Sequence, residues 1–183
     1  MPDPKLPDPI PPALPAPPGD VIVLDTGLFE LPLAASRNSP RKRIILPFHK
    51  EAADTLHRMF NVLQRGSYIR PHRHSTPPKA ESLIVLQGSL GCVAFDKDGK
   101  VTGTWALTAG GDRFGIDIAA GLYHTFLALE DDTVVFEVKP GPYDPSADKG
   151  FAPWAPAEGD TAAATYLREL TELVRRAPHG ERT

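Results

Sequence analysis

The chain has little of the features that mark extracellular, membrane or nucleic-acid-binding proteins. Its 183 residues include one cysteine, Cys92, so an internal disulfide framework is excluded and a reducing, cytoplasmic compartment is expected. No apolar run approaches the ~20 residues of a membrane helix, and prolines stand where a signal peptide would have its apolar centre. The net charge is −3 and the basic cluster at 41–43 is short, so we expect neither a nucleic-acid nor a membrane partner.

Proline, in contrast, is concentrated at the N-terminus, where residues 1–18 hold nine of the 21 prolines. Because proline fixes its own φ angle and lacks an amide donor, this stretch favours polyproline II or disorder over a helix or a strand. We therefore expect a disordered tail over residues 1–19. The remaining length suits one domain with a full hydrophobic core.

After the tail, short apolar runs alternate with turns. The turns carry glycine, serine or acidic residues, as at 65–67, 87–89, 96–100, 109–111 and 130–132. Many short strands at this spacing favour an all-β antiparallel sandwich or barrel over residues 20–140. The predicted strands are 21–24, 28–31, 42–46, 56–63, 68–74, 82–87, 90–95, 101–107, 113–118, 124–129 and 133–139.

The last part of the chain, residues 141–183, has a different pattern. Prolines forbid regular pairing there, yet Tyr143, Phe151 and Trp154 are too apolar for a free linker. We expect an extended segment packed on the barrel, with its aromatic rings serving either as anchors or as a cover for substrate. One helix should follow, capped by Asp160 or Thr161 and running to about residue 176.

Two histidines in the predicted strand 68–74 suggest a metal site. His72 and His74 stand two residues apart, so in a strand both imidazoles leave the same face. Glu81 opens the next apolar run, and His124 follows a turn at Gly121. Three imidazoles and one carboxylate on neighbouring strands suit a divalent transition metal such as Zn, Fe, Mn or Ni. A His-x-His pair also occurs without a metal, so a purely structural barrel is the alternative.

These spacings resemble the motifs of the cupin superfamily. The first motif is Gly, five residues, His-x-His, three or four residues, Glu, six residues, Gly. Here Gly66, His72, His74, Glu81 and Gly88 reproduce it, with a loop of six residues before the glutamate. The second motif is matched by Gly121 and His124, while its first glycine, proline and asparagine are replaced by Arg113, Ala119 and Ala128.

The resemblance implies a single cupin domain, which is a double-stranded β-helix or jelly-roll barrel. A closer resemblance, to the WbuC-type cupin-fold metalloproteins, covers nearly everything after the tail and is carried by residues 68–74, 136–143 and 148–156. Proteins of that type are often found with genes for surface-polysaccharide synthesis, and their reaction is not generally established. Cupin barrels often pair through edge strands, so the resemblance also implies a homodimer.

Other residues are candidates for lining a pocket beside the metal. If the histidines face inward, period two places Tyr68 and Arg70 on the same face. Arg70 would then bind an anionic substrate group, although a rim arginine paired with an acidic neighbour is an equal alternative. Asn61 is either a group that orients a ligand imidazole or an ordinary core amide.

Three functions follow from these residues. The first is a metal-dependent enzyme acting on a small anionic or carbohydrate substrate, in which Glu81, Tyr68 and Arg70 take part in isomerase-like or epimerase-like chemistry. With iron, a dioxygenase is the alternative reaction. The second is a non-catalytic sugar-binding or regulatory module stabilised by the metal, and the third is a barrel without a metal.

Overall fold

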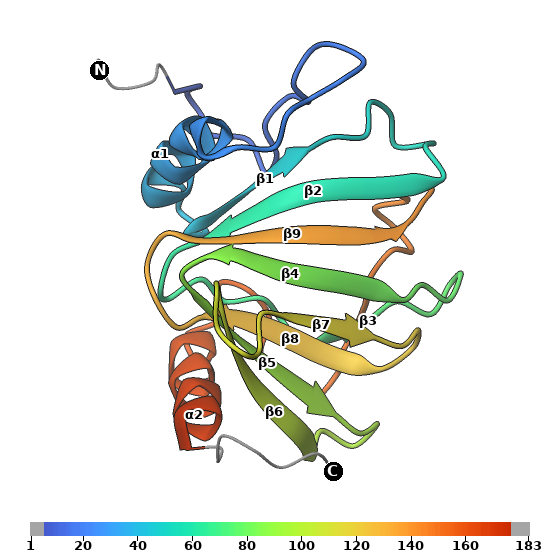
Figure 1. Ribbon diagram of the computed structural model, residues 1–183. Coiled ribbons are helices and arrows are strands. Elements are labelled where there is room, and N and C mark those ends of the chain that lie inside the picture. The colour runs from blue at the N-terminus through green and yellow to red at the C-terminus, as the bar shows by residue number, and fades with distance from the viewer. Residues whose placement is uncertain (1–5, 177–183) are drawn as a thin grey trace.

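A computed structural model describes residues 6–176, which fold into two five-stranded antiparallel sheets packed face to face (Figure 1). The first sheet has the order β1 (Arg43–Pro47), β2 (Leu56–Leu63), β9 (Thr133–Pro140), β4 (Glu81–Gln87) and β7 (Gly115–Ile118). The second has the order β10 (Gly150–Phe151), β3 (His72–Arg73), β8 (Tyr123–Ala128), β5 (Ser89–Phe95) and β6 (Val101–Thr108). The expected all-β jelly-roll barrel is confirmed.

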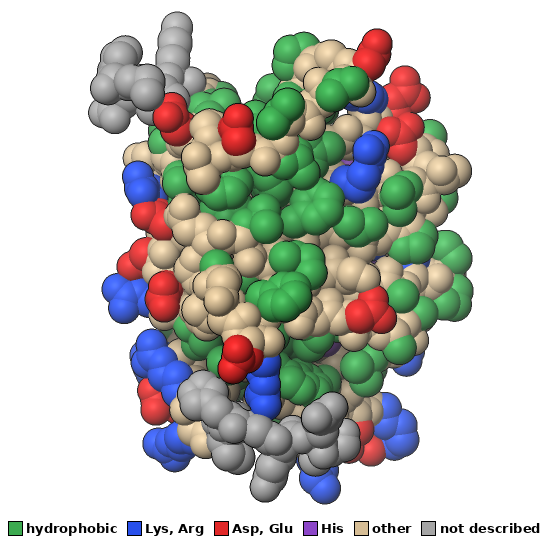
Figure 2. All heavy atoms as spheres, in the orientation of Figure 1, with side chains coloured by type: hydrophobic (Ala, Val, Ile, Leu, Met, Phe, Trp, Pro, Cys, Tyr) green, Lys and Arg blue, Asp and Glu red, His purple; other side chains and the backbone are tan. Residues whose placement is uncertain are grey.

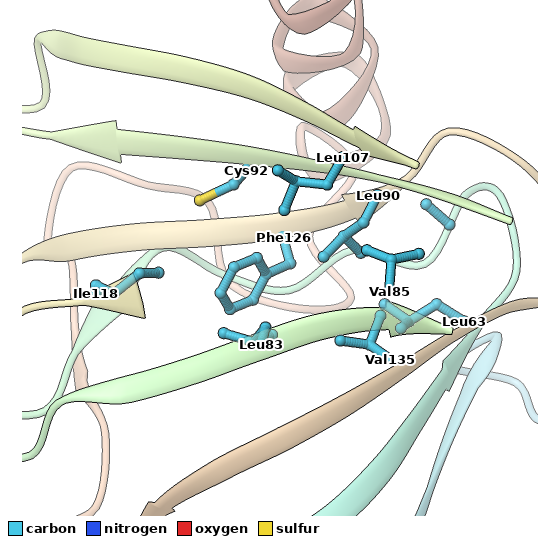
Figure 3. Close-up of a cluster of buried hydrophobic side chains, with 10 residues drawn as sticks. Leu63, Leu83, Val85, Leu90, Cys92, Leu107, Ile118, Phe126 and Val135 are labelled. Carbon is cyan, nitrogen blue, oxygen red and sulfur yellow. The ribbon is translucent and has the colours of Figure 1, made fainter. Parts of the chain in front are cut away.

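The main core lies between the two sheets, because one face of each strand is apolar. On β4 the side chains of Leu83 and Val85 are buried, while those of Ile84 and Leu86, which alternate with them, are exposed. Figure 3 shows Leu83 facing Phe126 of β8 across the barrel. Cys92 is buried in this cluster, and burial raises the pKa of its thiol. The apolar side chains that the two sheets turn toward each other therefore fill the interior of the barrel.

Strand β5 is buried at all seven positions because both of its faces are covered. Its outer face carries Val93 and Phe95, which pack against Leu170 and Val174 of helix α2 (Ala163–Arg176). Figure 1 shows α2 lying beside β5 and β6. The Asp160 carboxylate accepts a hydrogen bond of 2.9 Å from the Ala162 amide just before the helix. The C-terminal helix is therefore present as predicted.

The segment between β9 and α2 is extended and packed on the barrel, also as predicted. Its strand β10 pairs with β3, so that Phe151 lies opposite His72. The Trp154 ring packs 4.9 Å from the Phe95 ring and covers Gly99, where an added Cβ would lie 2.7 Å from the indole. Trp154 is thus an anchor, while Tyr143 is 45% exposed.

Two predicted strands, 21–24 and 28–31, are wrong. The chain there is irregular and then forms a 3-10 helix, η1 (Thr26–Phe29), and helix α1 (Glu30–Asn38). The Asp25 carboxylate accepts a hydrogen bond of 3.3 Å from the Leu28 amide, which starts the helical turn. Phe29 then packs edge-on against Phe60, with ring centroids 5.3 Å apart. A capping aspartate and tertiary packing outweigh the short apolar runs that suggested strands.

The predicted strand 68–74 is also shorter than expected, because only His72 and Arg73 form β3. The predicted strand 113–118 begins at Gly115. Between β1 and β2 the chain forms a turn, closed by a hydrogen bond of 3.1 Å from the Asp54 amide to the Glu51 carbonyl. Strand periodicity therefore does not apply to residues 68–71.

The proline-rich segment is packed where the structure describes it, in contrast to the expected disordered tail. Leu14 is only 3% exposed, and its amide donates a hydrogen bond of 2.8 Å to the carbonyl of Ile45 on the edge strand β1. Leu6 and Ile10 pack on the same cluster. Residues 1–5 of the expected tail lie outside the described residues. Within 6–176, no helix combines the length and the apolar character needed to cross a membrane.

Candidate metal centre

Three histidines converge inside the barrel. His72 on β3 and His124 on β8 are paired neighbours in the second sheet, and His74 follows β3 directly. One ligand nitrogen from each ring lies within 4.8 Å of the others. The ring centroids of His72 and His124 are 4.8 Å apart, and those of His72 and His74 are 5.1 Å apart. All three side chains are buried, and little histidine surface shows on the face in Figure 2.

Each imidazole is oriented by a backbone carbonyl. The Nδ1 atoms of His72, His74 and His124 lie 3.0, 2.5 and 2.9 Å from the carbonyl oxygens of Arg70, Asp148 and Leu122 respectively. Because a carbonyl oxygen only accepts, Nδ1 must carry the proton in all three rings. The Nε2 lone pairs are then free, which is the tautomer that metal-binding histidines use.

Glu81 reaches the same point from the facing sheet. Its Oε1 lies 2.5 Å from His124 Nε2, and its Oε2 lies 3.6 Å from His74 Nε2. The loop before Glu81 is long, but Glu81 still reaches the histidines. The Gly121 amide donates a hydrogen bond of 3.0 Å to the carbonyl of His74, the residue that precedes the loop, and so attaches the start of the loop to the barrel.

The arrangement fits a cation. His74 Nε2, His124 Nε2 and Glu81 Oε1 are buried and have no hydrogen-bond partner in the described chain. With the protons on Nδ1, lone pairs of nitrogen and oxygen would face one another at 2.5 Å, and such a cluster is costly to bury without a positive charge. Three imidazole nitrogens and a carboxylate oxygen are a ligand set that Zn, Fe, Mn and Ni all accept. Three buried histidines are therefore able to bind a metal.

The candidate ligands open onto a cavity of about 80 Å³, lined by His72 and Glu81. This volume exceeds the roughly 10–15 Å³ that one water requires. Leu83, Leu90 and Phe126 form apolar walls. The charged lining comprises four basic residues, Arg41, Arg43, Lys139 and Lys149, and two acidic residues, Glu81 and Glu137.

A buried charge network surrounds the centre, with Asp148 as its main anion. The Asp148 carboxylate accepts a hydrogen bond of 2.8 Å from Lys79 Nζ and lies 3.6 Å from Lys139 Nζ. Lys139 Nζ also lies 3.2 Å from Glu137 Oε1, and Asn61 donates to Glu137 Oε2 at 2.6 Å. Asn61 therefore lines the cavity but does not orient a ligand imidazole.

Sequence reasoning missed several of these residues. Glu137 and Lys139 had a signal, because they continue the inward-facing alternation of Thr133 and Val135 on β9. Charged residues at inward strand positions indicate a polar site. Asp148 and Lys149 had no such signal, since they lie in an irregular segment.

Tyr68 and Arg70 hold the C-terminal segment and do not line the cavity. The Tyr68 hydroxyl donates a hydrogen bond of 2.8 Å to the Pro156 carbonyl, and burial raises its pKa. Arg70 donates a hydrogen bond of 2.7 Å to the Ala152 carbonyl and stacks over Phe151 at 5.6 Å. Since residues 68–71 are not a strand, the alternation that placed both side chains beside the histidines does not hold.

A family model described as a domain of unknown function (DUF6016) matches residues 24–107. No curated protein matches the sequence. The structure resembles L-ribose isomerase from Cellulomonas parahominis, with a TM-score of 0.50, 18% identity, and coverage of 69% of this chain and 72% of that one. For the capsular polysaccharide assembling protein CapF from Staphylococcus aureus, the TM-score is 0.46, the identity 22%, and the coverage 58% and 28%. The match thus spans well under two thirds of CapF.

A variant of oxalate decarboxylase from Bacillus subtilis is similar at a TM-score of 0.44 and 19% identity, over 70% of this chain and 32% of that one. At these identities the likeness concerns the fold. The two antiparallel sheets and the likeness to L-ribose isomerase show a jelly-roll barrel of the cupin fold. The barrel carries a three-histidine site in its interior.

Proposed function

We propose that this chain is a mononuclear metal-binding cupin enzyme that acts on a small anionic or carbohydrate substrate. The observation that carries the proposal is the convergence of three imidazoles, each fixed through Nδ1 by a backbone carbonyl, beside the buried carboxylate of Glu81. A structural barrel has no need of a buried cluster of unpaired nitrogen and oxygen atoms.

His72, His74 and His124 would hold the ion, with Glu81 either as a fourth ligand or as a neighbouring base. A bound divalent ion would supply Lewis acidity, polarising an oxygen of the substrate. The Glu81 carboxylate is placed to accept or return a proton next to such an oxygen, because its oxygens face the same point as the imidazoles. This combination supports isomerase-like or epimerase-like chemistry next to a carbonyl group.

The cavity supports a small substrate. It has apolar walls and is bordered by more basic than acidic side chains, which favours an anionic group. A link to surface-polysaccharide sugars rests on the resemblance to WbuC-type proteins. A cytoplasmic location and a homodimer likewise stay predictions from the sequence.

Iron-dependent oxygenation is the second candidate, and the ligand set favours it as much as it favours zinc chemistry. Three histidines and one glutamate suit Fe²⁺ as well as Zn²⁺ or Mn²⁺. A dioxygenase would need coordination positions that remain open to water, as would the isomerase. A closed shell would instead indicate a metal that only stabilises a binding module.

Whether the bound metal keeps a coordination position open to water can be tested with Mn²⁺. Metal-free protein is loaded with one equivalent of Mn²⁺, and the longitudinal relaxation rate of water protons is measured. We expect a relaxivity above that of aqueous Mn²⁺, because slowly tumbling bound Mn²⁺ exchanging inner-sphere water relaxes protons faster. Binding of Mn²⁺ with a relaxivity below the aqueous value would contradict a reactive site. The His124→Ala variant, which loses a proposed ligand, serves as the control for Mn²⁺ bound elsewhere.

A further inference from the structure

The position of Lys149 in the fold suggests a second functional group at the cavity. Phe151 lies opposite His72 in the pairing of β10 with β3, so both side chains leave the same face of the sheet. Lys149 directly precedes β10 in the chain. It lines the cavity together with His72 and Glu81. The C-terminal segment thus brings a lysine to the cavity that His72 and Glu81 also line.

The other basic side chains of the cavity are already paired. Arg43 lies 2.7 Å from the Glu158 carboxylate, and Arg41 lies 3.7 Å from it. Lys139 contacts Glu137 and Asp148, whose charges outweigh the effect of burial and raise its pKa. For Lys149, no carboxylate of residues 6–176 comes within ion-pair distance.

The surroundings of Lys149 also differ from those of a solvated surface lysine. The residue is exposed as a whole, yet burial of its ammonium group, followed by the charge of Lys139, lowers its pKa. An unpaired ammonium group in a partly desolvated cavity favours a counter-ion.

We propose that Lys149 binds the carboxylate or phosphate group of a small anionic substrate at the mouth of the histidine site. This inference rests on the proposed function, which it narrows from anionic or carbohydrate substrates to those with a small oxyanion. The ammonium group is a compact charge with three donors, so it accepts either oxyanion without demanding the planar geometry that an arginine would impose. Arg70, which donates to the Ala152 carbonyl, is not needed for this role.

The test is calorimetric titration of the metal-loaded protein with sodium acetate and, separately, with inorganic phosphate. Removing the charge in Lys149→Gln should weaken binding of the preferred anion by about tenfold or more, because a charge-assisted hydrogen bond in a partly buried site is lost. Lys149→Arg should retain most of the affinity. Lys97→Gln is the matched control, since Lys97 is 83% exposed and its loss changes the net charge equally. Whichever anion binds more tightly, acetate or phosphate, identifies the group that Lys149 binds as a carboxylate or a phosphate.

Binding of both anions to Lys149→Gln within twofold of the wild type would overturn the inference, as would equal losses in Lys149→Gln and Lys97→Gln. Absence of acetate and phosphate binding to the wild type would overturn it too. Metal content is measured in the same samples. If the wild type and Lys149→Gln both hold one metal ion per chain, a negative result concerns Lys149 alone; a wild type without metal contradicts the proposed function itself.

Discussion

At the scale of single residues, Asp148 links the metal centre to the charges around it. Its backbone carbonyl accepts from His74 Nδ1 at 2.5 Å, and its carboxylate contacts Lys79 and Lys139. Burial would raise the pKa of this carboxyl, but the Lys139 charge and the Lys79 hydrogen bond lower it. Asp148 therefore stays ionised and balances two buried lysines.

Asp148→Asn should strongly destabilise the metal-free protein. The substitution keeps the size of the side chain but leaves Lys79 and Lys139 with less compensating charge, and removing one partner of a buried pair costs about 3–5 kcal/mol. The free energy of unfolding, measured by urea denaturation with a chelator present, gives the result. Asp98→Asn is the control, because the Lys97–Asp98 pair is exposed at 83% and 73% and should be worth less than about 1 kcal/mol. Equal losses in the two variants would contradict the buried network.

His57 gives the stability a pH dependence that does not involve the metal. It is 2% exposed and stacks on His49 at 3.9 Å; burial and then the neighbouring His49 lower its pKa. Between its lowered pKa in the folded state and about 6.5 in the unfolded state, the unfolded chain binds more protons. The free energy of unfolding should therefore fall as the pH drops below about 6.5, by at most about 1.4 kcal/mol per pH unit from this residue.

Urea denaturation between pH 7 and pH 5 checks this expectation. In His57→Gln the titrating group is absent, so the dependence of the free energy of unfolding on pH should be shallower than in the wild type. Identical slopes for the two proteins would mean that His57 has an ordinary pKa in the folded state.

The sequence predicted which residues converge where a motif fixes their spacing along the chain. His72, His74 and His124 converge as the motif spacing predicted. Tyr68 and Arg70 were placed by strand alternation, which fails because Pro71 precedes a strand of only two residues. Asp148 and Lys149 come from a distant segment without periodicity, so only the folded chain brings them to the site.

At the scale of elements, the N-terminal segment is part of the barrel wall. Leu14 fills a cluster with Phe29 and Ile44, and Pro12 lines the cavity of the metal centre. The pairing of Ala13 with Ile45 covers part of the β1 edge. Such a covered edge is less available for pairing with a second chain.

Leu14→Ala should lower the free energy of unfolding by about 2–5 kcal/mol, because it leaves a cavity in a buried cluster. Chemical denaturation measures the change. Leu173→Ala on α2 is the matched control, since Leu173 is 45% exposed and its truncation should cost much less. If Leu14→Ala cost no more than Leu173→Ala, the packing of the proline-rich segment on β1 would be refuted.

Element type was predictable where alternation or helical spacing was long and regular, as for β4, β9 and α2. It was not predictable for residues 21–38, where η1 and α1 form. Short apolar runs are compatible with either structure, and the decision there comes from the Asp25 cap and from packing against Phe60. Likewise, proline content predicted disorder for a segment in which Leu14 is buried and Leu6 and Ile10 are half-buried.

At the scale of the whole molecule, the candidate centre requires the entire barrel. Glu81 comes from one sheet, His72 and His124 from the other, and the carbonyl that orients His74 from the C-terminal segment. These groups meet only in the folded chain, so metal binding would be coupled to folding and would stabilise the barrel. The location of the site between the sheets also explains its enclosure.

The most direct test of the central claim is the metal content of protein purified without chelator or added metal, measured by elemental analysis. We predict one divalent transition-metal ion per chain in the wild type. His124→Ala should hold a small fraction of that, while His49→Ala, which removes a histidine outside the cluster, should keep it. A wild type without stoichiometric metal, or a His124→Ala variant with the full amount, would contradict the metal centre.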